Sequence, residues 1–130
     1  MGCGNAPAAP LASLPHAFVV LGADSHELPA GTYCWRSGEL GMCADMSSPE
    51  ELLKARHVAP FPVPRGVIPR LRYSRSPDTS RVIELRGLGA GIDIEPNYWP
   101  EVSGGLHTYT VSVRWPEGNV TYVFQLDGQP

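Results

Sequence analysis

The three cysteines carry the most distinctive chemistry in this sequence. A thiol can form a disulfide, bind a metal ion, take part in redox exchange or accept a lipid. Cys34 and Cys43 flank a segment that contains Gly38 and Gly41 and is typical of a turn, so a hairpin there can bring the two sulfurs together. Cys3 is then left as a candidate for lipidation. One disulfide and one lipid anchor are consistent with an oxidising compartment, and the alternative is three reduced thiols in a cytosolic protein.

Redox catalysis and zinc binding fit the cysteine spacing poorly. Disulfide oxidoreductases place two residues between their thiols, which lowers the pKa of one thiol near a helix N-terminus. The gap between Cys34 and Cys43 is longer than that. Together with His57 they would supply three zinc ligands, but without the paired short spacings of zinc sites. We therefore expect a structural disulfide, no metal and no cofactor.

Hydrolytic chemistry is also weakly indicated. Nucleophilic catalysis needs a base beside a Ser or Cys, and no nucleophile-elbow motif is present. The histidines are expected to lie at the surface: His16, His26, His57 and His107. Asp93 and Glu95 alternate along a predicted strand with Glu101 nearby, and such acids could cleave a glycosidic bond or bind calcium. Alternating acids are more typical of a solvated strand face, so we predict no catalytic residue.

The aromatic residues are better candidates for a binding surface. Tyr98 and Trp99 lie between two prolines in a predicted loop. A Trp in such a loop either covers the core, which we favour, or offers a flat surface to a sugar, peptide or protein. Trp35 follows Cys34, and we expect it to pack on the disulfide and to be a third candidate for this surface.

The bulk composition indicates one globular domain. The chain has 130 residues, of which 42% are hydrophobic and 18% charged, and its 14 Pro and 14 Gly favour turns over long helices. Residues 1–15 are rich in Ala and Pro and are predicted to form a flexible tether. Residues 16–130 are predicted to form the folded domain. No segment approaches the roughly 20 apolar residues of a membrane-spanning helix.

The charge distribution argues against a nucleic-acid partner. The formal net charge is −3. Residues 65–86 nevertheless carry six Arg against two acidic residues. Such a basic stripe could face anionic lipid or an acidic partner, although two strands with solvated outer faces are the favoured interpretation.

One short helix is predicted near residues 49–56. Ser48 is a suitable N-cap, Pro49 fits the first helical position, and Glu51 completes a capping box. Arg56 and the prolines that follow end the helix.

The rest of the domain reads as β-structure. Residues 109–115 and 120–126 alternate between apolar and polar around a turn, which predicts a β-hairpin with one apolar face. Further short strands are expected at 17–22, 31–36, 41–45, 67–73, 82–85 and 92–95. This spacing favours an immunoglobulin-like β-sandwich, with Tyr109 as the candidate corner tyrosine, over a partly open β-barrel.

Three motifs and one hairpin carry a resemblance to a known family: Gly31-Thr32-Tyr33-Cys34-Trp35, Cys43-Ala44-Asp45, Ser48-Pro49-Glu50-Glu51-Leu52-Leu53, and the hairpin from Tyr109 to Phe124. They resemble segments of small bacterial lipoproteins for which no activity is established. The start, Met1-Gly2-Cys3-Gly4-Asn5 before a Pro/Ala run, looks like that of a mature lipoprotein whose export signal has been removed. The resemblance covers roughly residues 28–56 and 105–126. It implies a Cys34–Cys43 bridge and an exported domain anchored to the outer face of the cell membrane through lipid on Cys3.

These observations favour a non-catalytic, extracytoplasmic binding or interaction module, which we expect to be a monomer. Its partners would be the membrane, through Cys3, and an envelope protein or glycan at the Tyr98–Trp99 loop. One alternative is a small cell-envelope hydrolase that uses Asp93, Glu95 and Glu101. Another is a structural accessory subunit or an inhibitor of an exported complex, with an exposed Pro-rich loop at 58–65.

Overall fold

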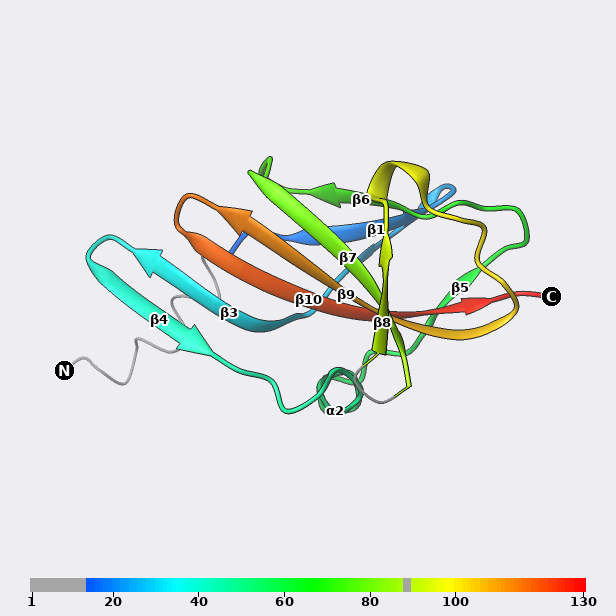
Figure 1. Ribbon diagram of the computed structural model, residues 1–130, viewed down its shortest axis with the longest axis horizontal. Helices are drawn as coiled ribbons and strands as arrows, with labels where there is room; N and C mark the ends of the chain where they lie inside the picture. Colours follow the sequence, from blue (N-terminus) through cyan, green and yellow to red (C-terminus); the bar gives the residue numbers. More distant parts are fainter. Residues whose placement is uncertain (1–13, 88–89) are drawn as a thin grey trace.

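The protein is a two-sheet β-sandwich with one short α-helix, as shown by a computed structural model that describes residues 14–87 and 90–130 (Figure 1). The small sheet has the strand order β2-β1-β6, formed by Asp24–Glu27, Ala17–Leu21 and Arg70–Tyr73. The large sheet has the order β4-β3-β10-β9-β7-β8, formed by Leu40–Ala44, Ala30–Ser37, Gly118–Gly128, Gly105–Trp115, Thr79–Arg86 and Ala90–Ile94. The sheets do not close into a barrel, so the predicted sandwich is confirmed and the barrel alternative is excluded.

The β9–β10 hairpin forms the centre of the large sheet and confirms the strongest sequence prediction. Its register pairs Val113 with Val120 and Tyr109 with Phe124. All four of these side chains are buried, because the period-2 alternation of the sequence directs one face of the hairpin into the sandwich.

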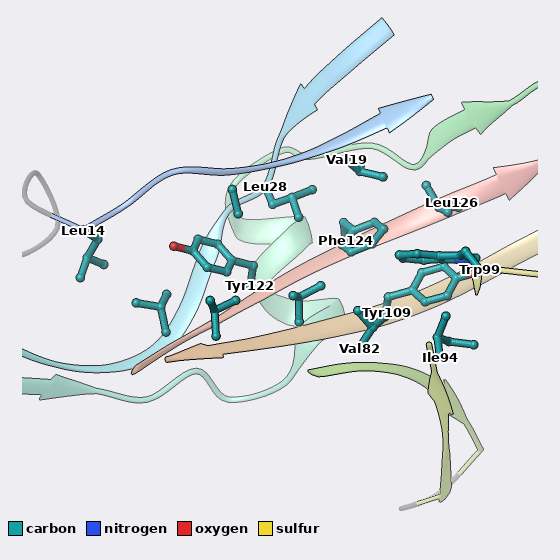
Figure 2. Close-up of a cluster of buried hydrophobic side chains, with 14 of the residues drawn as sticks. Leu14, Val19, Leu28, Val82, Ile94, Trp99, Tyr109, Tyr122, Phe124 and Leu126 are labelled. Atoms are coloured by element: carbon teal, nitrogen blue, oxygen red, sulfur yellow. The ribbon is translucent and has the colours of Figure 1, made fainter. Parts of the chain in front are cut away.

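The hydrophobic core lies between the two sheets and extends to Leu14 (Figure 2). Leu14 is buried, and the hydroxyl of Tyr122 on β10 donates a hydrogen bond of 2.5 Å to the carbonyl of Pro15. The packed domain therefore includes two residues that we had assigned to the tether, because Leu14 supplies an apolar anchor after the Pro/Ala run. The rest of the predicted tether, 1–13, including Cys3, lies outside the described residues.

The helix α2 (Pro49–Ala55) begins as the sequence predicts. Ser48 is its N-cap, and the Ser48 hydroxyl accepts a hydrogen bond of 3.1 Å from the backbone N–H of Glu51. Leu53 is the buried residue of α2, and the helix contacts β10 of the large sheet. A second, shorter helix, the 3₁₀ turn η2 (Pro96–Tyr98), follows β8.

Two strands form where sequence reasoning predicted none. β2 has the polar sequence Asp-Ser-His-Glu and is held by pairing with β1. β5 (Phe61–Val63) lies inside the predicted Pro-rich loop at 58–65 and pairs in parallel with the end of β10. Val63 is buried, so this segment is partly built into the sandwich and is not the fully exposed loop expected for an inhibitor.

Candidate binding site

The disulfide is the first predicted site that the structure confirms. Cys34 on β3 and Cys43 on β4 lie directly opposite each other and are bonded. Both residues are exposed, whereas Trp35 is buried and packs edge-on against Trp115 with ring centroids 5.9 Å apart. The expectation that Trp35 packs on the disulfide was wrong, because adjacent residues of a strand point to opposite faces. Trp35 is therefore also not an exposed binding surface.

A cleft of about 630 Å³ lies where the small sheet, the large sheet and η2 meet. Its walls come from the β6 region, from β7 and from the η2 segment: Ile68, Pro69, Arg70, Leu71, Tyr73, Ser80, Glu95, Pro96, Asn97 and Trp99. Figure 1 shows η2 beside β6 at this end of the sandwich. The volume is in the range of small-molecule sites in proteins, roughly 300–1,000 Å³.

Two residues of this cleft each carry a buried polar atom without a partner. Among the described residues, the buried side-chain N and O atoms that lack a hydrogen bond are the Tyr73 hydroxyl and the Trp99 indole nitrogen. Buried polar groups in folded proteins are normally hydrogen-bonded, and leaving one unpaired costs about 1–3 kcal/mol. The two atoms are themselves enclosed, but the residues that carry them both line one cleft, which is the best candidate for a ligand site.

Tyr73 lies close to Ser80 and Trp99 lies close to Tyr109, near enough to influence a pKa but outside the geometry of a well-formed hydrogen bond. Burial raises the pKa of Tyr73, and the nearby Ser80 hydroxyl partly offsets this rise. Burial, together with the charge of Glu84, raises the pKa of the Tyr109 hydroxyl to about 12, and the nearby Trp99 indole opposes this shift. The enclosed polar atoms of Tyr73 and Trp99 therefore lie behind a cleft wall in which the polar side chains of Arg70, Glu95 and Asn97 are exposed.

The predicted Tyr98–Trp99 surface divides into one exposed and one buried ring. Trp99 is 4% exposed, and its ring lies against Tyr109 and Phe124, with centroids 5.2 and 6.3 Å away (Figure 2). Trp99 therefore covers the core, which was the favoured alternative. Tyr98 is 82% exposed at the end of η2, between two residues that line the cleft.

The predicted acidic cluster is divided among separate roles. Asp93 is exposed and forms a two-point contact with Arg81, at 2.9 and 3.3 Å, which holds the pKa of its carboxyl below the ordinary value. Glu95 lines the cleft and caps η2 by accepting a hydrogen bond from the Asn97 backbone N–H. Glu101 is exposed in the following loop. Within the described ranges, no three His, Cys, Asp or Glu residues are placed to hold a metal ion.

A Glu–His–Ser arrangement with a buried Glu84 is the feature that sequence reasoning missed. Glu84 is only 7% exposed, and its carboxylate lies 2.9 Å from Nδ1 of His107. Nε2 of His107 lies 3.2 Å from the Ser103 hydroxyl and 2.9 Å from the Ser103 carbonyl oxygen. His107 is half-buried, so the expectation of a surface histidine was wrong. The pairing of β7 with β9 aligns Glu84 with this region, and a sequence pattern does not show that alignment.

This arrangement has the order of contacts of a catalytic triad. Nδ1 of His107 faces the Glu84 carboxylate, and Nε2 lies within hydrogen-bonding distance of both the hydroxyl and the carbonyl of Ser103. The tautomer of His107 decides which of the two Ser103 oxygens it bonds. A Cβ at Gly128 would collide with the Ser103 carbonyl, so glycine there lets the loop close onto His107. These contacts join β7, β9 and the 99–104 loop through Glu84, His107 and Ser103.

Four of the six arginines in the basic stripe at 65–86 each contact another side chain. Arg75 pairs with Glu117 at 2.6 Å, Arg81 with Asp93, and Arg86 with Glu84 at 3.1 Å. The guanidinium of Arg72 lies over the ring of Phe18, 4.3 Å from its centroid. Arg70 differs from these four because it lines the cleft.

The fold and the site define a β-sandwich domain with a polar cleft at one open edge. Comparisons with family models, with curated proteins and with solved structures each find no match to this chain. In the described residues no helix is long and apolar enough to cross a membrane. The functional assignment therefore rests on the residues and their geometry.

Proposed function

We propose that this protein is a non-catalytic binding domain of the bacterial cell envelope, anchored to the outer face of the membrane through lipid on Cys3. The observation that carries the binding function is the cleft itself, whose walls include the exposed polar side chains of Arg70, Glu95 and Asn97. The Cys34–Cys43 disulfide supports an oxidising compartment. Cys3, the cysteine that the disulfide does not use, and the lipoprotein-like motifs support the anchor.

The two alternatives have less support. Asp93, a member of the acidic set proposed for a hydrolase, is held by Arg81, and that contact favours a structural ion pair. The Pro-rich segment proposed for an inhibitor contributes β5 to the large sheet. Neither the Arg81–Asp93 ion pair nor the pairing of β5 with β10 involves a residue that lines the cleft.

The binding function is tested by retention of cell-envelope fractions on the immobilised full chain. We expect the double variant Arg70→Ala/Asn97→Ala to lose retention, because both exposed side chains line the cleft. The matched control is Arg65→Ala, an exposed arginine outside the cleft wall. Equal retention by wild type and double variant would contradict a ligand site in this cleft.

A further inference from the structure

We propose that the ligand of the Tyr73–Trp99 cleft is a neutral oligosaccharide. This inference rests on the proposed binding function and assigns the chemical class of its ligand. It is drawn from the charge balance of the walls, their hydrogen-bonding groups and the exposed ring of Tyr98.

The charge balance of the cleft favours a neutral ligand. One cationic side chain, Arg70, and one anionic side chain, Glu95, line it. In the described part of the chain, neither is held in an ion pair within 4.0 Å. A strongly anionic ligand would meet Glu95 and a strongly cationic one would meet Arg70, whereas a neutral ligand can hydrogen-bond to both.

The polar groups of the walls match hydroxyl groups. Arg70 donates, the free carboxylate oxygen of Glu95 accepts, and the amide of Asn97 and the hydroxyl of Ser80 do both. A sugar hydroxyl both donates and accepts, so it can pair with any of these four groups. Apolar side chains such as Leu71 and Pro96 complete the walls, as in sites where a few polar groups orient a ligand.

Tyr98 offers an exposed aromatic ring next in the chain to the cleft wall. It is 82% exposed, and its chain neighbours Asn97 and Trp99 both line the cleft, whereas Tyr98 itself does not. A sugar ring carries its hydroxyls on the rim and C–H groups on its faces. One residue of an oligosaccharide can therefore pack a face on Tyr98 while the next hydrogen-bonds inside the cleft.

An extended peptide fits this edge of the sandwich less well. β6 is the terminal strand of the small sheet, and an unpaired edge can accept a peptide strand. However, β6 is only four residues long, follows Pro69 and carries Arg70 and Arg72. Short length, proline and charge are the features that disfavour the addition of a strand.

The test is a titration of the ¹⁵N-labelled full chain with three trisaccharides: neutral chitotriose, neutral maltotriose and anionic trigalacturonic acid. We expect a neutral trisaccharide to shift the indole signal of Trp99. The indole signal of Trp115 is the internal control, because that N–H is bonded to the Arg75 carbonyl at 3.1 Å. We expect a dissociation constant between roughly 10 μM and 1 mM, which Tyr98→Ala and Asn97→Ala each weaken by about tenfold. Leu40→Ala, which removes an exposed apolar side chain outside the cleft wall, should leave it unchanged.

Three results would overturn the oligosaccharide assignment. One is an unmoved Trp99 signal with all three sugars at about 10 mM. Another is sugar binding that neither Tyr98→Ala nor Asn97→Ala weakens. The third is trigalacturonic acid binding more tightly than both neutral sugars. If envelope retention still depends on Arg70 and Asn97 in any of these cases, the cleft binds an envelope protein or another ligand, and the proposed binding function stands without a sugar.

Discussion

His107 and Glu84 join two neighbouring strands through a half-buried contact of 2.9 Å between Nδ1 and Oε2. Burial alone would raise the pKa of the Glu84 carboxyl, but hydrogen bonds from His107 and Arg86 outweigh it and hold the pKa below its ordinary value. The carboxylate is therefore more favourable in the folded than in the unfolded chain. The ionised Glu84 carboxylate therefore stabilises the folded domain by an amount that depends on pH.

Replacing Glu84 by Gln should remove this stability. We expect the free energy of unfolding at neutral pH to fall by about 1.5–3 kcal/mol, the usual range for hydrogen bonds to a charged group. Folding lowers the pKa of the Glu84 carboxyl below its ordinary value of 4.5. The variant should therefore be less stable than wild type by the full amount at pH values above 4.5, and this difference in unfolding free energy should disappear as the pH falls through the lowered pKa of the folded chain. Urea unfolding of both proteins across this range measures it, with exposed Glu101→Gln as control. A difference independent of pH would contradict the assignment.

Replacing Cys34 and Cys43 together by Ser should destabilise the domain without changing its fold. The bridge closes a short loop in the unfolded chain, and loops of this size correspond to about 2–3 kcal/mol in the chain-entropy description. Urea unfolding should place the variant at the same stability as reduced wild type. A wild type that loses no stability on reduction would show that the bridge does not constrain the unfolded chain.

Ser48→Ala should weaken the start of α2. The Ser48 hydroxyl accepts from the Glu51 backbone N–H, and loss of such a cap costs about 1 kcal/mol. Thermal unfolding measures the effect, and Ser47→Ala, one residue outside the cap, is the matched control. Equal melting temperatures for the two variants would rule out a stabilising cap.

Tyr122→Phe should loosen the start of the domain. The Tyr122 hydroxyl is buried and bonded to the Pro15 carbonyl, so its removal leaves that acceptor unpaired and should cost about 1–3 kcal/mol. The measurement is the free energy of unfolding in urea. Tyr98→Phe, on an exposed ring, is the control and should have no effect. An unchanged stability for Tyr122→Phe would contradict a structural role for this bond.

The Tyr122 bond also differs from the sequence expectation for a corner tyrosine. In the described part of the chain, the tyrosine hydroxyl that donates to a backbone carbonyl belongs to Tyr122, not to Tyr109. Tyr109 instead stacks on Phe124 in the core, with ring centroids 5.1 Å apart. Both positions are apolar-face residues of the final hairpin, and alternation alone does not distinguish them.

The features predicted correctly are those encoded locally. The Ser48 cap and the 109–126 hairpin depend on residues close together in the sequence, and both form as expected. The polar strand β2 depends on its partner β1, so its own sequence does not reveal it. The Glu84–His107 contact joins residues 23 positions apart and depends on strand register. The cleft likewise brings Tyr73 and Trp99 together from separate elements.

The intact mass of the protein purified from its own host tests the proposal of an exported, lipid-anchored domain most directly. The mass should be measured before and after reduction and alkylation. We expect a lipid-sized increment on Cys3, and alkylation of Cys34 and Cys43 only after reduction. A chain without lipid whose three thiols all react before reduction would contradict both the anchor and the oxidising compartment.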